Sequence, residues 1–161
     1  MIIRRAREDD FGIVSTFLKE IAEQHRRGRP DIFKEDVQKY SYEEYCELLS
    51  DDSKPVFVAE SLDGNKILAH AFCRIIIQPE RSVAFSRKTL FLDDLYVSPE
   101  VRGGGIGGEM IKYLKSFALE QGCYNLELNV WEFNGGAVSF YEKLGLHTQK
   151  RQMEYVLNGD S

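Results

Sequence analysis

Glycines dominate one short stretch of the sequence. The segment "VSPEVRGGGIGGEMI", Val97 to Ile111, holds five glycines between Gly103 and Gly108, directly before residues with helical periodicity. Where a loop enters a helix, successive backbone N–H groups can converge on an anion at the positive helix end, and side chains would block that approach. Together with the cation of Arg102, these glycines indicate a binding site for a phosphate or pyrophosphate.

Other interpretations of the glycines are less favoured. Gly103, Gly105 and Gly108 match the GxGxxG dinucleotide fingerprint, but that fingerprint follows the first strand of a βαβ unit, and here several expected strands precede it. A P-loop needs Lys and then Ser or Thr after its last glycine, where this chain has Glu109. A plain flexible turn explains the loop poorly, because glycines in the first helical turn cost helix stability.

Two adjacent carboxylates form the second unusual feature. Asp93 and Asp94 interrupt "TLFLDDLYV", an otherwise apolar run with the character of a central strand. Successive side chains of a strand point to opposite faces, so at most one of the two can face a reacting group. A carboxylate in such a place is either a general base or part of a structural ion pair, and both interpretations stay open.

The elements that must position these residues alternate along the chain. Short strands are expected over 1–6, 55–61, 66–77, 89–97, 124–131 and 151–157, and helices over about 9–25, 41–49, 106–121 and 134–144. Ser41 and Glu44 form a candidate capping box, Asp63-Gly64 marks a hairpin turn, and Asn134 is a suitable N-cap. The pattern predicts a mixed α/β fold.

Composition limits the possible functions. The 161 residues are 43% hydrophobic, which predicts a single domain over 1–161. The net charge of −5 disfavours nucleic-acid binding, and the absence of a long apolar run and of a signal-peptide core predicts a cytoplasmic protein without membrane contact. Cys46, Cys73 and Cys123 lack CxxC spacing, so free thiols are expected rather than disulfides or a metal site.

A family resemblance rests on two motifs in order. "RGGGIG", Arg102 to Gly107, resembles the [Q/R]-x-x-G-x-[G/A] acyl-CoA signature of the GNAT superfamily of N-acetyltransferases. "NGGAVSFYEKLGL", Asn134 to Leu146, is similar to the N-x-x-A-x-x-F-Y-x-K-x-G-F element of that superfamily and departs from it only at Leu146. The expected strand order agrees along nearly the whole chain, but the motifs are specific only from about residue 92 to residue 146.

The resemblance implies a fold and a cofactor. The fold would be a mixed, mostly antiparallel central sheet flanked by helices, with two strands splayed at the acyl-CoA site. Acetyl-CoA would be the co-substrate. Its pyrophosphate would lie at the glycine loop, formed by Arg102, Gly103, Gly104, Gly105, Ile106, Gly107 and Gly108. Its pantetheine arm would contact the backbone of Leu95, Tyr96 and Val97, with further cofactor contacts from Asn134 and Ala137.

The resemblance also implies catalytic roles. Tyr141 would protonate the CoA thiolate, although the alternative is a core aromatic on the inner face of its helix. Asp93 would be the base or the residue that positions a water, with Asp94 as the second candidate, and His70, Glu60 and Arg74 are reserve candidates. A backbone N–H, that of Leu95, would meet the oxyanion. A covalent route through Cys73 or Cys123 is less favoured, because neither belongs to a His-paired motif.

The expected reaction is direct acetyl transfer to a primary amine in a ternary complex. The alternatives are acetylation of a protein N-terminus or lysine, and a non-catalytic acyl-CoA-binding module. "LFLDDLYV" is most similar to the diamine and polyamine branch, which favours a small-molecule amine. Selectivity would come from Gln24 to Tyr45 and Gln78 to Lys88, where Tyr40, Tyr42 and Tyr45 either wall an amine pocket or pack. A homodimer is possible, since dimers are common in the superfamily.

Overall fold

The computed structural model describes residues 1–158. The chain forms two compact units, Met1–Asn129 and the residues from Val130 onward, and each is described by itself. The expectation of a single domain over 1–161 stays a prediction.

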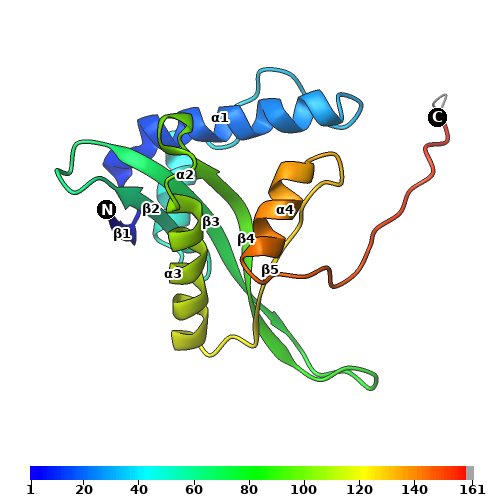
Figure 1. Ribbon diagram of the computed structural model, residues 1–161. Helices are drawn as coiled ribbons and strands as arrows, with labels where there is room; N and C mark the ends of the chain where they lie inside the picture. The colour runs from blue at the N-terminus through cyan, green and yellow to red at the C-terminus, as the bar shows by residue number, and fades with distance from the viewer. Residues whose placement is uncertain (159–161) are drawn as a thin grey trace. The chain divides into compact units, whose positions relative to one another are not determined.

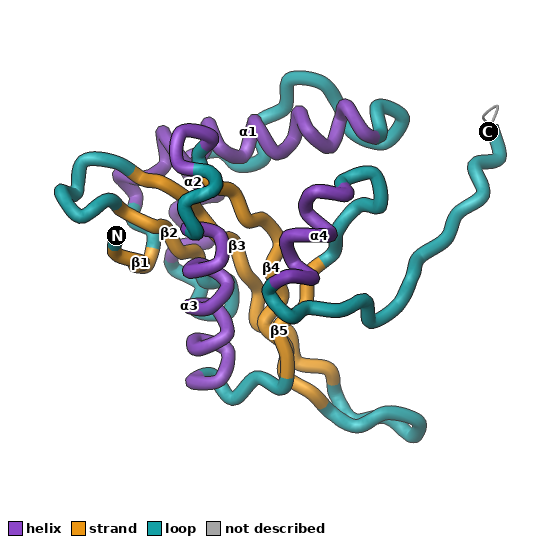
Figure 2. The backbone as a smooth tube through the Cα atoms, viewed as in Figure 1, coloured by secondary structure: helices purple, strands orange, loops and turns teal. Residues whose placement is uncertain are grey.

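The first unit is built on a five-stranded sheet in the order β1-β2-β3-β4-β5 (Figures 1 and 2). Its strands are β1 (Ile2–Arg5), β2 (Val56–Glu60), β3 (Ile67–Gln78), β4 (Arg87–Val97) and β5 (Asn125–Leu128). Neighbouring strands are antiparallel except for β4 and β5, which run parallel. The prediction of a mixed, mostly antiparallel sheet flanked by helices is confirmed.

Helices cover both faces of this sheet. They are α1 (Phe11–Gly28), α2 (Tyr42–Leu49) and α3 (Ile106–Glu120). On β2, the Phe57 ring contacts Tyr113 and Phe117 of α3, whereas Val58 belongs to a buried cluster with residues of α1 and α2. Because consecutive strand residues point to opposite faces, α1 and α2 cover one face and α3 covers the other.

Local sequence signals explain most element ends. The Ser41 hydroxyl accepts from the Glu44 N–H and the Glu44 carboxylate accepts from the Ser41 N–H, which confirms the capping box of α2. The turn between β2 and β3 contains Gly64 at φ +72°, a left-handed conformation that suits glycine. Both predictions depended only on neighbouring residues, and both hold.

The antiparallel pair β3 and β4 extends beyond the rest of the sheet. Its register continues to Gln78 and Arg87, and a bridge between Arg81 and Ala84 follows in the connecting hairpin. Val83 and Phe85 at the end of this hairpin are almost fully exposed.

The second unit contains α4 (Gly135–Lys143), with Asn134 as its N-cap. The strand expected over 151–157 is wrong, because residues 151–156 carry no strand within the described part of the chain. Met153 is 91% exposed and Tyr155 82% exposed. A strand requires hydrogen bonds to a neighbouring strand, and alternating side chains alone do not supply them. Through residue 158, no helix combines the length and hydrophobicity needed to cross a bilayer.

The three cysteines are free thiols, as the sequence predicts. Cys73 and Cys123 are buried, whereas Cys46 is half-buried. Burial raises the pKa of the Cys73 thiol, and nearby Asp93 raises it further. A thiol held protonated in this way is a poor nucleophile, which disfavours a covalent route through Cys73.

Candidate functional site

Asp93 is the extra residue of a β-bulge in β4, directly before Asp94. Phe72 of β3 pairs with Asp94, and the next residue, Cys73, pairs with Leu92, so Asp93 is the extra residue on β4. Phe72 and Cys73 are consecutive on β3 and so point to opposite faces, and each shares its face with its partner on β4. Leu92 and Asp94 therefore point to opposite faces, although they are two positions apart. The bulge therefore places Asp94 on the α1 and α2 face with Phe72 and leaves Asp93 exposed.

Asp93 is held by Arg74 of β3. The guanidinium donates from Nε to Oδ2 at 2.8 Å and from Nη2 to Oδ1 at 2.9 Å, and it lies 5.0 Å from the Phe91 ring centroid. The hydrogen bonds from Arg74 to Asp93 raise the pKa of the guanidinium. Both oxygens of the expected base therefore accept a hydrogen bond from a permanent cation.

Asp94 forms an ion pair with Lys39, in the connection between α1 and α2. The Asp94 carboxylate is buried, and the Lys39 side chain is 42% exposed. Burial lowers the pKa of Lys39, but the Asp94 charge and hydrogen bond outweigh burial, so the pKa of Lys39 is raised overall. Lys39 thus stays an ammonium and ties the α1–α2 connection to β4.

The end of β4 lies beyond its ladder with β5. The last rung pairs Leu92 with Leu128, and β4 continues to Val97. Leu95, Tyr96 and Val97, the predicted pantetheine contacts, lie in this extension. The Tyr96 side chain is buried, with its ring centroid 4.8 Å from that of Phe17 in α1, so only its backbone is available to a ligand.

The glycine loop follows β4 and begins α3. Gly103 and Gly105 adopt φ of +83° and +82°, and Gly105 is the N-cap of α3. A Cβ on Gly104 would lie 3.3 Å from the Val101 carbonyl oxygen. Ile106, Gly107 and Gly108 form the first turn of α3, where backbone N–H groups have no partner within the helix.

Arg102 connects this loop to β4. Its Nε donates to the Val97 carbonyl oxygen at 3.0 Å, and its guanidinium carbon lies 5.3 Å from the Tyr96 ring centroid. The predicted loop residues and the predicted strand residues are therefore brought together within the first unit.

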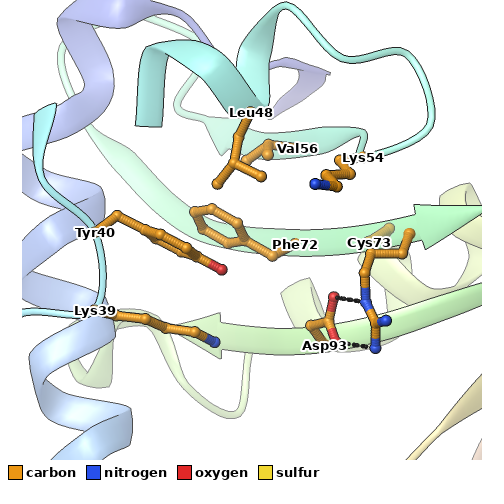
Figure 3. Close-up of a pocket in the computed structure, with 9 residues that line it drawn as sticks. Lys39, Tyr40, Leu48, Lys54, Val56, Phe72, Cys73 and Asp93 are labelled. Carbon is orange, nitrogen blue, oxygen red and sulfur yellow. Dashed lines mark hydrogen bonds and ion pairs between the residues drawn. The ribbon is translucent and has the colours of Figure 1, made fainter. Parts of the chain in front are cut away.

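A pocket of about 290 Å³ adjoins the bulge (Figure 3). It is lined by Lys39, Tyr40, Leu48, Lys54, Val56, Phe72, Cys73, Arg74 and Asp93. In Figure 3 the Tyr40 hydroxyl and the Lys54 ammonium are directed into the pocket, whereas the Lys39 side chain runs along β4, where its ammonium pairs with Asp94. The pocket volume lies just below the roughly 300–1,000 Å³ typical of small-molecule sites.

The three tyrosines considered for an amine pocket separate in the structure. Tyr40 lines the pocket, its ring centroid 5.7 Å from that of Phe72. Tyr45 is fully buried and donates its hydroxyl to the Arg7 carbonyl oxygen at 2.8 Å, and Tyr42 packs edge-on against Phe11. Tyr40 lines the pocket and the other two tyrosines pack, and a role of Tyr40 in binding an amine stays a prediction.

Two of the reserve candidates for the base, Glu60 and His70, have contacts that suit a role in stability rather than in proton transfer. The Glu60 carboxylate accepts two hydrogen bonds of 3.0 Å from Arg4, which also binds Asp10. His70 is fully buried beside the rings of Phe17 and Phe72, and neither ring nitrogen has a hydrogen-bond partner within residues 1–158. Burial lowers the pKa of His70 to about 3, which makes it a poor proton acceptor at neutral pH.

Lys39 and Lys54 were missed as individual residues. The sequence marked the segment that contains Lys39 as selective for substrate, but nothing local distinguishes this lysine from its neighbours. A carboxylate buried in a strand requires a partner cation, and this requirement of Asp94 was the one signal in the sequence that a lysine or arginine must lie nearby.

In the second unit, the Asn134 side chain accepts from the Ala137 N–H at 3.2 Å, as expected of an N-cap. Tyr141 lies on α4, and its carbonyl oxygen accepts from the Leu146 N–H at 3.1 Å. The cofactor and acid roles of Asn134, Ala137 and Tyr141 stay predictions.

The model of the Acetyltransferase (GNAT) family matches residues 18–146. This chain belongs to the GNAT family. The chain is 30% identical over 154 residues to a thialysine N-epsilon-acetyltransferase from Sus scrofa, a match that covers 90% of this chain and 83% of that protein. A glucosamine 6-phosphate N-acetyltransferase from Trypanosoma brucei brucei is 34% identical over 83 residues, which covers 52% of this chain and 54% of that one.

Solved structures share the fold of this chain. A mutant of the BH1408 protein from Bacillus halodurans superposes with a TM-score of 0.92 at 30% identity, covering 98% of this chain and 99% of that one. An aminoglycoside acetyltransferase from an uncultured soil metagenomic sample has a TM-score of 0.71 at 20% identity, covering 98% and 96%, and shows the fold alone. The family match and the acetyltransferase relatives identify the protein as an acetyl-CoA-dependent N-acetyltransferase, which argues against the alternative of a non-catalytic module.

The glycine loop of this GNAT protein fits the cofactor that the family implies. A pyrophosphate needs several N–H donors without intervening side chains, and the loop combines left-handed glycines with the first turn of a 15-residue helix. Arg102 adds a cation beside the loop. The residues present thus suit the diphosphate part of acetyl-CoA.

Proposed function

We propose that this GNAT protein acetylates a primary amine of a small molecule, by direct attack of the amine in a ternary complex with acetyl-CoA. The observation that carries the proposal is the pocket of about 290 Å³ that adjoins the bulge of β4 and includes Asp93. A site of this size fits a small acceptor, and its position beside the β4 extension supports an acceptor site next to the strand proposed to bind the pantetheine arm.

An alkylammonium has a pKa of about 10.4 and no lone pair on nitrogen, so it must lose one proton before it attacks. We assign this proton to Asp93, with Asp94 as the second candidate. Each carboxylate already binds a cation, Arg74 or Lys39. Transfer through a bridging water suits this arrangement better than direct contact, since a water can use a remaining lone pair of the carboxylate.

The other steps are assigned to named groups of the chain. Bound acetyl-CoA supplies the activated acetyl thioester. The amine nitrogen forms a bond to the carbonyl carbon, the Leu95 N–H stabilises the carbonyl oxygen as it gains charge, and the carbon–sulfur bond then breaks. Tyr141 donates its phenolic proton to the departing thiolate, and the second proton that the nitrogen loses as the amide forms restores the Tyr141 phenol. Asn134 and Ala137 are assigned to the pantetheine arm, and residues 102–108 to the pyrophosphate.

Similar proteins support a small acceptor. The relatives named above are a thialysine and a glucosamine 6-phosphate N-acetyltransferase, and both names specify small amines. Acetylation of a protein N-terminus or lysine stays the alternative, and it is an outcome of the same experiment.

The test is acetyl-CoA-dependent thiol release across a panel of amines: diamines and polyamines, free amino acids, an amino sugar, an aminoglycoside, and peptides with a free N-terminus or lysine. We expect saturable release with a small amine and little release with peptides. Efficient release with peptides alone would replace the proposal by the alternative. A cytoplasmic location, a homodimer and a single domain over 1–161 remain predictions.

A further inference from the structure

Each cation that lines the pocket beside the bulge is paired with a carboxylate. The pairs are Arg74 with Asp93, Lys39 with Asp94, and Lys54 with Asp51. All lining residues lie within the described part of the chain, and none of them offers an unpaired charge to a ligand. An acceptor amine must therefore be oriented in this pocket by hydrogen bonds.

An ammonium group only donates hydrogen bonds, so its position depends on the oxygen atoms around it. Among the side chains that line the pocket, only those of Tyr40 and Asp93 carry oxygen. Both carboxylate oxygens of Asp93 already accept from Arg74, at 2.8 and 2.9 Å. Within residues 1–158 the Tyr40 hydroxyl has no hydrogen-bond partner. This hydroxyl is therefore the side-chain oxygen of the lining that is left for an acceptor.

Packing of the Tyr40 ring fixes the direction of its hydroxyl. The ring stacks on Phe72 at a centroid distance of 5.7 Å and an interplanar angle of 20°. The Lys39 Nζ lies 5.5 Å from the same ring centroid. In Figure 3 the hydroxyl is directed into the pocket, toward the side where Asp93 and Arg74 lie. Because the ring is already held, a ligand bound by this oxygen does not have to order it.

The backbone of Tyr40 is anchored through both of its neighbours in sequence. Lys39 binds Asp94 of β4, and Ser41 is the N-cap of α2. The Gln38 side chain also donates to the Tyr40 carbonyl oxygen at 2.9 Å. These contacts hold the end of the α1–α2 connection beside β4, so the Tyr40 hydroxyl has a set position relative to the bulge.

Tyr40 suits an amine in both of its protonation states. Burial raises the pKa of the Tyr40 phenol above its ordinary value, so the group stays neutral. A phenol oxygen accepts a hydrogen bond from an N–H while it keeps its own proton. The same N–H can be held before and after the ammonium loses a proton, and the lone pair then formed on nitrogen stays available for attack.

From these contacts we propose that the Tyr40 hydroxyl binds the acceptor nitrogen, by accepting a hydrogen bond from one of its N–H groups. This inference rests on the proposed function, because it names a further residue that binds the acceptor in the same site. Asp93 would remove the proton through a water, and Tyr40 would orient the nitrogen for attack.

The test removes the hydroxyl and keeps the ring. Tyr40→Phe can still stack on Phe72, so the shape of the pocket is retained. With the most rapidly acetylated amine of the panel, we expect kcat/KM for the amine to fall about tenfold or more, as the loss of one hydrogen bond to a charged group causes. KM for acetyl-CoA should stay unchanged, because the effect is confined to the acceptor.

Tyr42→Phe is the matched control. Tyr42 lies two residues further along the chain, outside the lining of the pocket, and its hydroxyl donates to Glu8 at 3.4 Å. This variant should leave kcat/KM for the amine unchanged, and thermal unfolding of both variants checks that the fold is intact. A crystal structure with CoA and the amine should place the amine nitrogen within about 3.2 Å of Tyr40 Oη.

Failure of this inference can be told apart from failure of the proposed function. If the wild type acetylates an amine and Tyr40→Phe keeps the same kcat/KM, the Tyr40 assignment is overturned and amine acetylation stands. An equal loss of acetyl-CoA affinity in Tyr40→Phe would also overturn it, since the effect would not be specific to the acceptor.

A binding experiment covers the case in which the wild type acetylates no amine of the panel. Lysine and 1,5-diaminopentane are then titrated calorimetrically into the wild type and into Tyr40→Phe, each with bound CoA. We expect Kd for at least one of these amines to rise about tenfold or more in the variant. Equal affinities, or no binding to either protein, would overturn the inference.

Discussion

Lys39 and Asp94 are 55 residues apart in sequence and form an ion pair between the α1–α2 connection and β4. Asp94 follows the bulge residue Asp93, so this contact fixes the connection directly at the candidate site. The pair therefore links a segment expected to select the substrate to the strand expected to bind the cofactor.

Breaking this pair should destabilise the protein. Lys39→Met leaves the buried Asp94 carboxylate without its cation, and we expect a loss of about 1–3 kcal/mol in the free energy of unfolding, less than for a fully buried pair because Lys39 is partly exposed. Urea unfolding measures it. Adding Asp94→Asn should recover much of the loss, since the stranded charge is then gone. Lys66→Met, which disrupts an exposed contact with Glu100, should cost less than about 0.5 kcal/mol. A similar loss in both lysine variants would contradict this assignment.

Asp93 should be the more important carboxylate for turnover. With the best acceptor of the amine panel, Asp93→Asn should lower kcat by roughly 10²-fold or more, in the range of lost general-base catalysis. The amide keeps the shape of the side chain, so acetyl-CoA affinity should change little. Retained kcat in Asp93→Asn, together with a large loss in Asp94→Asn, would transfer the role to Asp94.

Alanine substitutions at Gly105 and Gly64 distinguish a loss of stability from a loss of CoA binding, because both glycines have similar backbone conformations. Gly105 has φ +82° and Gly64 has φ +72°, and a Cβ at either position would meet open space. Alanine at each should therefore cost about 1 kcal/mol of stability, from the unfavourable left-handed backbone alone. Only Gly105→Ala should also weaken CoA binding, measured by calorimetry. Unchanged CoA affinity in Gly105→Ala and in the more disruptive Gly105→Glu would reject the loop assignment.

Tyr141→Phe should reduce turnover and spare acetyl-CoA affinity. The substitution removes one hydroxyl and keeps the ring, so a lost proton donor should lower kcat by roughly 10²-fold or more. Tyr124→Phe is a suitable control, because Tyr124 is 80% exposed. If both variants keep the wild-type kcat, Tyr141 is a packing residue.

His70 should make stability depend on pH. Burial lowers its pKa to about 3 in the folded protein, against an ordinary value of 6.5. Between these values the unfolded chain binds a proton that the folded chain does not, so the free energy of unfolding falls as pH decreases, by at most about 1.4 kcal/mol per pH unit. His70→Phe should show a shallower slope from about pH 6.5 to 4 in urea titrations. His147→Phe, at an exposed histidine, should keep the full slope.

The caps and the turn predicted from neighbouring residues are confirmed. The capping box at Ser41, the turn at Gly64 and the Asn134 cap each depend on a few adjacent residues. The two caps form their expected hydrogen bonds, and Gly64 has the expected positive φ. The bulge was not predictable in this way. The bulge depends on the register between β3 and β4, and no residue near Asp93 indicates that β4 has one extra residue there.

Long-range partners were equally hidden. The sequence showed that Asp93 and Asp94 were unusual in a central strand and allowed for a structural ion pair, but it did not identify Arg74 and Lys39 as the partners. The expected strand at 151–157 failed for a related reason. Its alternating side chains satisfied the local pattern, but pairing requires another strand, which a local pattern cannot reveal.

The burial of two cysteines affects how released CoA can be detected. Cys73 and Cys123 are enclosed, and burial keeps both thiols protonated, so a colorimetric disulfide reagent should react with them slowly in the folded protein. Cys46 is partly accessible and would supply most of the background. A Cys46→Ser enzyme should therefore give a nearly silent baseline, and a late rise in that baseline would report unfolding during the assay.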